Sequence, residues 1–408
     1  MVFAYAAHFL ELLSPMFFLY YATSALGLEE YGLIVVSYSI FSVCSIIVGL
    51  GFNVSMPNRL ALLCNDRHRM SMAMSKIVTQ RALVCLLFSV IYGCICFFIP
   101  FYESFRCVFL AVLLGLFGVA FSPFLVFQAI EKVAVFTFVS SVIKALLTGI
   151  GYFLISNESD IIEASIVIFA PYLVSSIVMW SYLNRKHELY ITPISIRNSN
   201  SLGMKDLAVT LAGQFSSIVY ITIVPIGIAM AFGSSYAAVY GVAEKLVMAA
   251  RGMVGPITNV MVPVTAKKHN SGEEILRSNV FLTLYVCGPI FFIGSVLLYV
   301  FSEIIIFYLA GEHYLSAVIY LKILSFVPFI GFISNVCGVQ GLVAIGKYNI
   351  YAQILIAISM LHCFLVVVLV VAVGPQGVVT MLLITEVLIA GSMIFTLQTI
   401  LSASKSRE

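Results

Sequence analysis

Charged side chains inside long apolar segments are the residues of this sequence best placed to do chemistry. A charge at the centre of a bilayer costs about 2.5–3.5 kcal/mol on insertion scales unless it faces protein or a water-filled cavity. The acids are Glu11, Asp206, Glu244 and Glu386, and the bases are Arg81, Lys144, Lys245, Arg251 and Lys322. Because bases outnumber acids, a cavity lined by them would favour an anionic head group. We take the five bases as candidate substrate-binding residues and the three glutamates as candidate ion-coupling residues.

Several of these charges also have a purely structural interpretation. Arg81 lies within about one turn of a predicted membrane interface, where its side chain can snorkel to water. Glu244 and Arg251 are seven residues apart, so they share a helix face and can neutralise each other through a bridging group. The deeper charges, for which a place in a cavity wall is favoured, are Lys144, Lys322 and Glu386.

Signatures of enzymes and cofactor sites are absent from the sequence. Residues 341–347 resemble the start of a phosphate-binding loop, but Tyr348 stands where such a loop needs Ser or Thr, and the segment follows a membrane helix rather than a strand. The nine cysteines have no metal-ligand spacing. We therefore expect no catalytic activity, no metal, no cofactor and no nucleic-acid partner.

The elements that must position these charges are membrane helices. The chain has 62% hydrophobic and 10% charged residues, whereas a soluble domain has about 25% charged residues. Its apolar runs are continuous rather than alternating, which favours helices of about twenty residues over a barrel. The sequence predicts an all-α polytopic membrane protein with about twelve transmembrane helices, at 2–23, 31–52, 77–99, 105–128, 135–156, 162–183, 206–231, 237–262, 280–301, 317–341, 350–373 and 378–400.

The connections between these segments alternate in charge. One set carries the bases Arg59, Arg67, Arg69, Lys76, Lys132, Arg185, Lys186, Arg197, Lys205, Lys267, Lys268, Arg277 and Lys347. The other set carries the acids Glu29, Glu30, Glu103, Glu158, Asp160, Glu303 and Glu312, with Arg106 as its exception. Since basic connections stay in the cytoplasm, we expect both termini to be cytoplasmic.

A polar segment near the middle of the chain divides six predicted helices from six. We expect an N-terminal lobe at 1–190, a cytoplasmic linker at 191–205 and a C-terminal lobe at 206–408. A faint repeat with an offset of 206 residues supports this division, because Asn-Val-x-x-Pro at 53–57 recurs at 259–263. Two lobes of equal orientation are a known transporter design.

Short motifs spread along the whole chain resemble those of one known family. They lie at 25–33, 49–52, 240–245, 255–257, 262–263, 311–314, 346–347 and 374–377. In order and topology they are similar to the O-antigen repeat-unit flippases (Wzx-type), which are polysaccharide flippases of the multidrug/oligosaccharidyl-lipid/polysaccharide exporter superfamily.

The resemblance implies a MATE-like fold, with two six-helix lobes around a central cavity. It further implies a multi-pass protein of the bacterial inner membrane that moves an undecaprenyl-diphosphate-linked oligosaccharide to the periplasmic leaflet by alternating access, coupled to an ion gradient. The implied partners are this lipid-linked oligosaccharide, membrane lipids, a polysaccharide polymerase and a chain-length regulator.

Two other functions are compatible with the same composition. A cation-coupled multidrug or metabolite exporter of this fold needs an acidic site for cationic drugs, and the surplus of buried bases argues against it. A membrane polysaccharide polymerase usually carries a long periplasmic loop, which this chain lacks.

Overall fold

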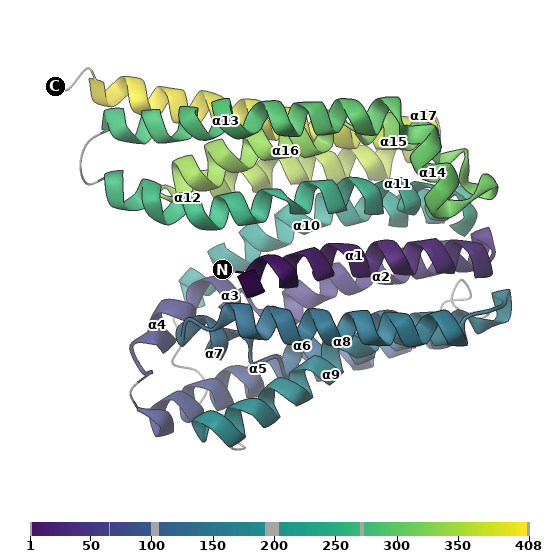
Figure 1. Ribbon diagram of the computed structural model, residues 1–408, viewed down its shortest axis with the longest axis horizontal. Helices are drawn as coiled ribbons and strands as arrows, with labels where there is room; N and C mark the ends of the chain where they lie inside the picture. The colour runs from purple at the N-terminus through teal and green to yellow at the C-terminus, as the bar shows by residue number, and fades with distance from the viewer. Residues whose placement is uncertain (1, 65, 99–105, 192–203, 270–272, 406–408) are drawn as a thin grey trace. The chain divides into compact units, whose positions relative to one another are not determined.

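A computed structural model describes residues 2–64, 66–98, 106–191, 204–269 and 273–405 of the chain. Throughout these ranges the regular secondary structure is helical, without a single β-strand. This confirms the predicted all-α class. The long helices of each unit run alongside one another (Figure 1).

The chain divides into two compact units, Met1–Phe215 and Ser216–Glu408. We call them unit 1 and unit 2. The division falls inside helix α10 (Met204–Phe232). Most of the predicted linker at 191–205 lies outside the described residues, so the boundaries drawn from the sequence stay a prediction.

Unit 1 consists of long helices joined by short helical turns. In chain order its elements are α1 Val2–Ala25, α2 Leu28–Gly49, α3 Phe52–Ser55, α4 Pro57–Ala61, α5 Arg67–Phe98, α6 Arg106–Ala120, α7 Phe124–Ala129, α8 Val133–Leu154, the 3₁₀ turn η2 Glu158–Asp160, α9 Ile161–His187 and the beginning of α10.

Close helix packing in unit 1 depends on small residues. Helix α6 packs on α9 and α2, and α1 packs on α8. A Cβ atom added at Gly118 of α6 would collide with the backbone of Tyr172 and Leu173 in α9. The Ser176 hydroxyl of α9 donates a hydrogen bond to the Gly118 carbonyl oxygen at 2.7 Å. Glycine therefore allows these two backbones to touch, because it has no side chain to keep them apart.

Unit 2 begins with the remainder of α10 and is more often interrupted. Its other elements are α11 Ser234–Gly252, α12 Val254–His269, α13 Glu273–Val300, α14 Ser302–Ala310, the 3₁₀ turn η4 Glu312–Tyr314, α15 Ala317–Leu324, α16 Val327–Asn335, the π-helix η5 Val336–Val343 and α17 Tyr348–Lys405.

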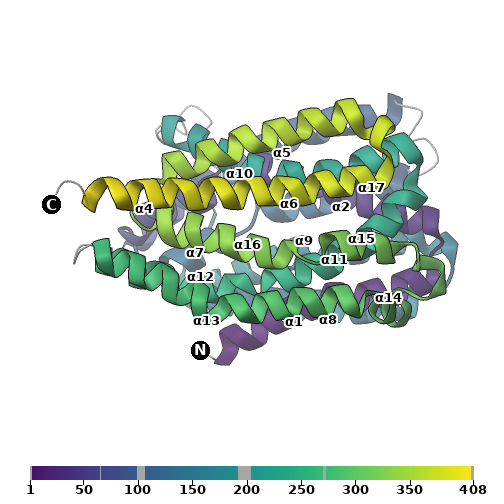
Figure 2. The ribbon, with the colours of Figure 1, turned by 90° about the horizontal axis from the view of Figure 1, so that it is seen from above.

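Helix α17 consists of two membrane-length halves joined by a sharp reversal. The break is at Gly374, whose φ of 70° and ψ of 175° are not helical, and Pro375 follows it. Figure 2 shows the chain reversing at this end of α17. The two halves contact each other through a hydrogen bond of 2.7 Å between His362 Nδ1 and Thr385 Oγ1. His362 is thus a buried, hydrogen-bonded histidine.

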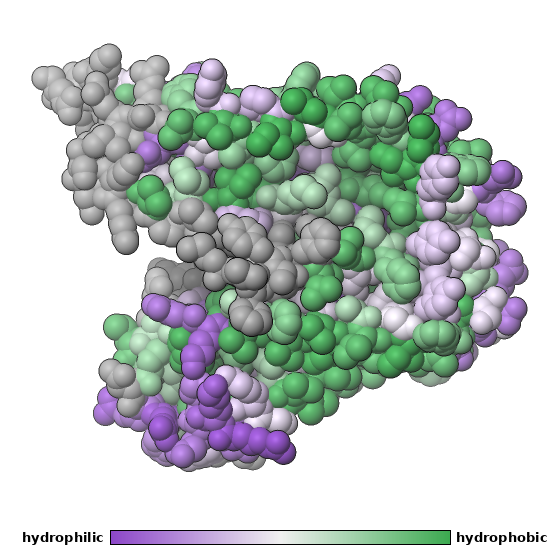
Figure 3. Space-filling model, viewed as in Figure 1, coloured by the Kyte–Doolittle hydropathy of each residue, from purple (hydrophilic) through white to green (hydrophobic). Residues whose placement is uncertain are grey.

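Apolar side chains cover the flanks of the helices, and hydrophilic ones gather at the helix ends (Figure 3). Large exposed apolar residues include Leu87 at 64%, Phe153 at 80% and Phe364 at 64%. A water-soluble monomer does not expose apolar surface on this scale. The surface is therefore the lipid-facing surface of a multi-pass membrane protein.

Within the described ranges, nine helical segments are long and apolar enough to cross a bilayer. Tyr348–Ser402 is one of these nine, although Gly374 divides it into two helices. The predicted helix at 237–262 is interrupted at Met253, between α11 and α12. Helix α11 carries Glu244, Lys245 and Arg251 and is not among the nine. The number twelve therefore stays a prediction.

Candidate functional site

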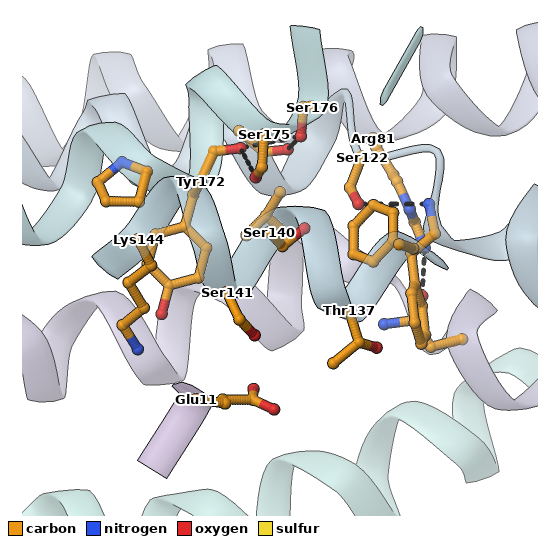
Figure 4. Close-up of a pocket in the computed structure, with 16 residues that line it drawn as sticks. Glu11, Arg81, Ser122, Thr137, Ser140, Ser141, Lys144, Tyr172, Ser175 and Ser176 are labelled. Carbon is orange, nitrogen blue, oxygen red and sulfur yellow. Dashed lines mark hydrogen bonds between the residues drawn. The ribbon is translucent and has the colours of Figure 1, made fainter. Parts of the chain in front are cut away.

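A cavity of about 590 Å³ lies inside unit 1. Helices α1, α5, α6, α8 and α9 supply most of its wall, and Asn53 of α3, Phe124 of α7 and Ser122 of the loop between α6 and α7 complete it (Figure 4). Its volume is in the range of pockets that bind small molecules. The polar residues in its wall are Glu11, Asn53, Arg81, Ser122, Thr137, Ser140, Ser141, Lys144, Tyr172, Ser175 and Ser176.

Helix α8 presents a polar stripe to this cavity. Thr137, Ser140, Ser141 and Lys144 all line it, and their spacing of three, one and three residues places them on one helix face. The residues between and around them in α8 are mostly apolar. The local sequence therefore forms an amphipathic helix whose polar face is turned to the cavity.

Arg81 of α5 is the most deeply buried charge of the cavity, with an exposure of only 2%. Its Nη2 donates a hydrogen bond to Asn53 Oδ1 at 3.0 Å, and its Cζ lies 5.6 Å from the centroid of the Phe52 ring. Among the described residues, its Nε has no hydrogen-bond partner. Burying a charge without full pairing is costly, and this nitrogen is a donor that an anion in the cavity could use. The structure rules out the alternative that Arg81 snorkels to water.

Lys144 marks the other end of the cavity. Figure 4 shows Arg81 and Lys144 at opposite ends, with Ser140 and Ser141 between them and Glu11 of α1 drawn below Ser141. Lys144 is half-buried and Glu11 is exposed. The cavity wall therefore carries both signs of charge, and its most deeply buried charge is Arg81 at one end.

Two more candidates from the sequence form an ion pair inside unit 2. Arg251 Nη1 of α11 donates to Glu386 Oε1 of α17, and Tyr220 Oη of α10 donates to the same carboxylate oxygen at 2.8 Å. Glu386 is 1% exposed. A Cβ atom added at Gly331 would lie 3.2 Å from Arg251 Nε, so this glycine leaves space for the guanidinium. Arg251 thus pairs with Glu386 and not with Glu244.

The remaining candidates belong to unit 2 and are not among the residues that line the cavity of unit 1. Glu244 and Lys245 are half-buried neighbours on α11. Lys322 of α15 is exposed, and its Nζ lies 5.9 Å from the centroid of the Tyr299 ring. The structure therefore brings Glu11, Arg81 and Lys144 together in one cavity. It places Lys322 on the surface of unit 2.

Sequence reasoning did not single out the hydroxyl groups of the cavity or the partner of Arg81. The stripe on α8 could have been found from its helical spacing within an apolar segment. Asn53 belongs to the Asn-Val-x-x-Pro repeat, but nothing in the sequence indicates that it reaches Arg81. Tyr172, Ser175 and Ser176 carry no such signal, because serine is common throughout this chain.

The cavity can bind a ligand that is anionic at one end and rich in hydroxyl groups elsewhere. A guanidinium binds phosphate oxygens through charge-assisted hydrogen bonds. Serine and threonine hydroxyls both donate and accept, as the hydroxyl groups of a sugar do.

Two relatives are similar to this chain over nearly its whole length. The chain is 26% identical over 397 residues to a putative O-antigen transporter of Shigella dysenteriae, covering 94% of this chain and 96% of that protein. It is 22% identical over 385 residues to a putative O-antigen transporter of Escherichia coli strain K12, covering 94% and 92%.

Solved structures show the same fold at low sequence identity. An inward-facing MATE family multidrug resistance transporter of the MOP superfamily matches with a TM-score of 0.75 and 14% identity, covering 97% of this chain and 95% of that one. The lipid II flippase MurJ in an inward closed conformation matches with a TM-score of 0.72 and 14% identity, covering 97% and 87%. The predicted MATE-like fold is confirmed.

The family described as polysaccharide biosynthesis protein has a sequence profile that matches residues 2–269 of this chain. This segment is about two thirds of the sequence and contains the whole cavity of unit 1. The resemblance drawn from the short motifs is thereby confirmed, and the chain belongs to the polysaccharide biosynthesis protein family.

Proposed function

We propose that this protein is a flippase that moves an undecaprenyl-diphosphate-linked oligosaccharide, an O-antigen repeat unit or a related one, from the cytoplasmic to the periplasmic leaflet of the bacterial inner membrane. The observation that carries the proposal is Arg81, a buried guanidinium in the wall of a hydroxyl-lined cavity, whose Nε has no partner in the part of the chain that the structure describes. The family match and the relatives named putative O-antigen transporter support it.

The physical reason for such a cavity is the cost of moving sugars through lipid. Each sugar hydroxyl that enters hydrocarbon loses its hydrogen bonds to water, which costs several kcal/mol per group in a solvent that offers none. A wall with eight polar hydroxyl-bearing or amide side chains replaces that water, and Arg81 compensates the diphosphate charge. The lipid tail can stay in the bilayer throughout.

We further propose that transport proceeds by alternating access and is coupled to an ion gradient. Glu11 is the candidate coupling acid with a place in the cavity wall. Glu386 is engaged by Arg251 and Tyr220, and Glu244 lies on α11 of unit 2 and is not among the residues that line the cavity. In this proposal the protein acts as a carrier and works beside a polymerase and a chain-length regulator.

The test is a deletion strain complemented with wild-type protein or with Arg81→Gln. The deletion strain should lose surface polysaccharide and accumulate lipid-linked repeat units that face the cytoplasm. Wild-type protein should restore the surface polymer, and Arg81→Gln should restore less than about a tenth of it at equal protein level. Gel analysis measures the surface polysaccharide. Labelling of the repeat units exposed on inverted membrane vesicles measures the lipid-linked repeat units that face the cytoplasm.

Arg69→Gln is the matched control, because the Arg69 side chain is 70% exposed, pairs with Asp66 three residues earlier and does not line the cavity. This variant should behave as wild type. Normal surface polysaccharide in the deletion strain, with no redundant transporter present, would refute the proposal. Selective sensitivity of that strain to cationic drugs would instead favour a multidrug exporter.

A further inference from the structure

The two ends of the unit 1 cavity differ in the kind of group that they can accept. The Arg81 end has a buried guanidinium whose Nε is unpaired among the described residues. At the other end Lys144 is only half-buried, so solvent screens its attraction for an anion more than it does at the buried Arg81. A diphosphate therefore gains most at the Arg81 end, and a neutral group with donors and acceptors suits the other end.

The polar stripe of α8 connects these two ends. From Thr137 to Lys144 the helix rises by about 10 Å, at about 1.5 Å per residue. Figure 4 shows Ser140 and Ser141 along this path. A ligand with its phosphate at Arg81 would therefore lie along α8 with its sugars against this stripe.

The serine hydroxyls of α9 and of α8, on two sides of the cavity, differ in whether they already donate hydrogen bonds within the protein. On α9, Ser175 Oγ donates to the Tyr172 carbonyl at 3.1 Å, and Ser176 Oγ donates to the carbonyl of Gly118 at 2.7 Å. On α8, the buried Ser140 Oγ has no hydrogen-bond partner within the part of the chain that the structure describes. Buried serines in helices usually bond to the preceding turn, so an unpaired one in a cavity wall indicates a group that a ligand completes.

We propose that Thr137, Ser140 and Ser141 form the surface that selects which glycan this protein carries, while Arg81 holds the phosphate that every cargo shares. The inference rests on the proposed function and assigns its specificity to these three side chains. A site that hydrogen-bonds ligand hydroxyls discriminates strongly, because its polar groups are left unpaired with the wrong ligand.

The first test compares cargoes that share the lipid diphosphate and differ in their sugars. The triple variant Thr137→Val, Ser140→Ala and Ser141→Ala removes three hydroxyls with little change of volume. It should reduce export of the native repeat unit at least tenfold and change the ratio between native and foreign repeat units at least fivefold. Arg81→Gln should reduce export of all cargoes by a similar factor and leave the ratio unchanged.

The matched control is Ser165→Ala, which removes a buried hydroxyl of α9 that bonds the Ile161 carbonyl and does not line the cavity. This control variant should leave unchanged both the export of the native repeat unit and the ratio between native and foreign repeat units. Equal losses for all cargoes in the triple variant, or no loss, would overturn the assignment. If the triple variant gives such a result while deletion of the gene still abolishes export and wild-type protein restores it, the assignment of the glycan surface fails and the proposed flippase function stands. The two failures can therefore be told apart.

The second test uses the single tryptophan of the chain, Trp180. Its Nε1 donates a hydrogen bond to the Phe121 carbonyl oxygen at 2.6 Å, and Ser122, the residue that follows Phe121, lines the cavity. Trp180 fluorescence of the full-length purified protein should therefore change on ligand binding. The probes are inorganic pyrophosphate and the delipidated, dephosphorylated oligosaccharide of the native repeat unit.

Pyrophosphate should bind the triple variant as it binds wild type and should bind Arg81→Gln at least tenfold more weakly. The oligosaccharide should bind Arg81→Gln as it binds wild type, and it should bind the triple variant at least tenfold more weakly. The same pattern for both probes would overturn the division of the cavity into a phosphate end and a glycan surface. Absence of a saturable change with either probe would overturn it as well.

Discussion

The buried Arg81 and the half-buried Arg251 show two different ways of keeping a guanidinium inside a membrane protein. Arg251 is neutralised by Glu386 and further held by Tyr220. Arg81 lines a cavity and has the neutral partner Asn53, and its Nε has no partner within the described ranges. Because a compensated charge has little left to offer a ligand, we expect Arg81 to act in binding and the Arg251–Glu386 pair to act in holding α10, α11 and α17 together.

Breaking the ion pair of unit 2 should destabilise the protein strongly. Arg251→Met or Glu386→Leu alone leaves a buried charge without its partner, which costs about 3–5 kcal/mol. The double variant removes both charges and should recover most of the loss. Thermal unfolding of the purified protein in detergent measures the free energy of unfolding.

The exposed pair Arg67–Glu188 provides the control for this cycle, with side-chain exposures of 64% and 73%. Exposed pairs contribute about 0–1 kcal/mol, so Arg67→Met should change stability little. A double variant of the buried pair that is no more stable than either single variant would contradict the expected role.

At the scale of elements, the contact between α6 and α9 determines the shape of one side of the cavity. Gly118 itself lines the cavity, and so do Ser175 and Ser176 on the facing helix. A wider separation of the two helices would therefore change both the packing and the volume available to a ligand.

Gly118→Ala tests this contact directly. The added Cβ falls on the backbone of α9, which cannot move aside as a flexible side chain can. Overpacking of this kind costs about 1–3 kcal/mol, and transport should fall with stability. Gly149→Ala in α8 is the control, since nothing lies within 4 Å of its added Cβ. Equal melting temperatures of the two variants would show that α6 and α9 are not in close contact.

The reversal in α17 depends on the backbone conformation of Gly374 rather than on its surroundings. No atom lies within 4 Å of a Cβ added there, but the φ of 70° disfavours any side chain. Gly374→Ala should therefore cost about 1–3 kcal/mol, because a φ of 70° with a ψ of 175° is a conformation that essentially only glycine adopts. Gly391→Ala, later in α17 and equally free of neighbours, should be neutral or slightly stabilising. Thermal unfolding compares the stabilities of these two variants. A Gly374→Ala variant as stable as wild type would argue against the reversal at this position.

At the scale of the whole molecule, the charge of the connections predicts how the chain crosses the membrane. A fluorescent protein fused after residue 408 should fluoresce, because this end is expected in the cytoplasm. Alkaline phosphatase fused after Asn157 should be active, since the adjoining Glu158 and Asp160 belong to the acidic connections.

Alkaline phosphatase fused after Lys132, in a basic connection, is the matched control and should be inactive. Activity at Lys132 together with inactivity at Asn157 would invert the proposed orientation. Intermediate activity at both positions would contradict the assignment of the helix at 135–156 as a spanning segment.

The sequence by itself determined the class of this protein, its helical segments and its family. Long continuous apolar runs leave the backbone only one way to satisfy its hydrogen bonds in lipid, so helices such as α8 and α9 follow from composition and length. The predicted helix at 135–156 agrees closely with Val133–Leu154 of the structure. Family motifs are local patterns of sequence, and they need no knowledge of contacts.

The tertiary structure alone decided which charges share a site. Depth in a segment can be read from the sequence, but the direction of a side chain depends on the neighbouring helices. Lys144 and Lys322 are equally deep by sequence, yet Lys144 lines a cavity and Lys322 is exposed. Likewise, Arg251 meets Glu386 across 135 residues of chain. Such encounters result from helix packing, which no local pattern of residues specifies.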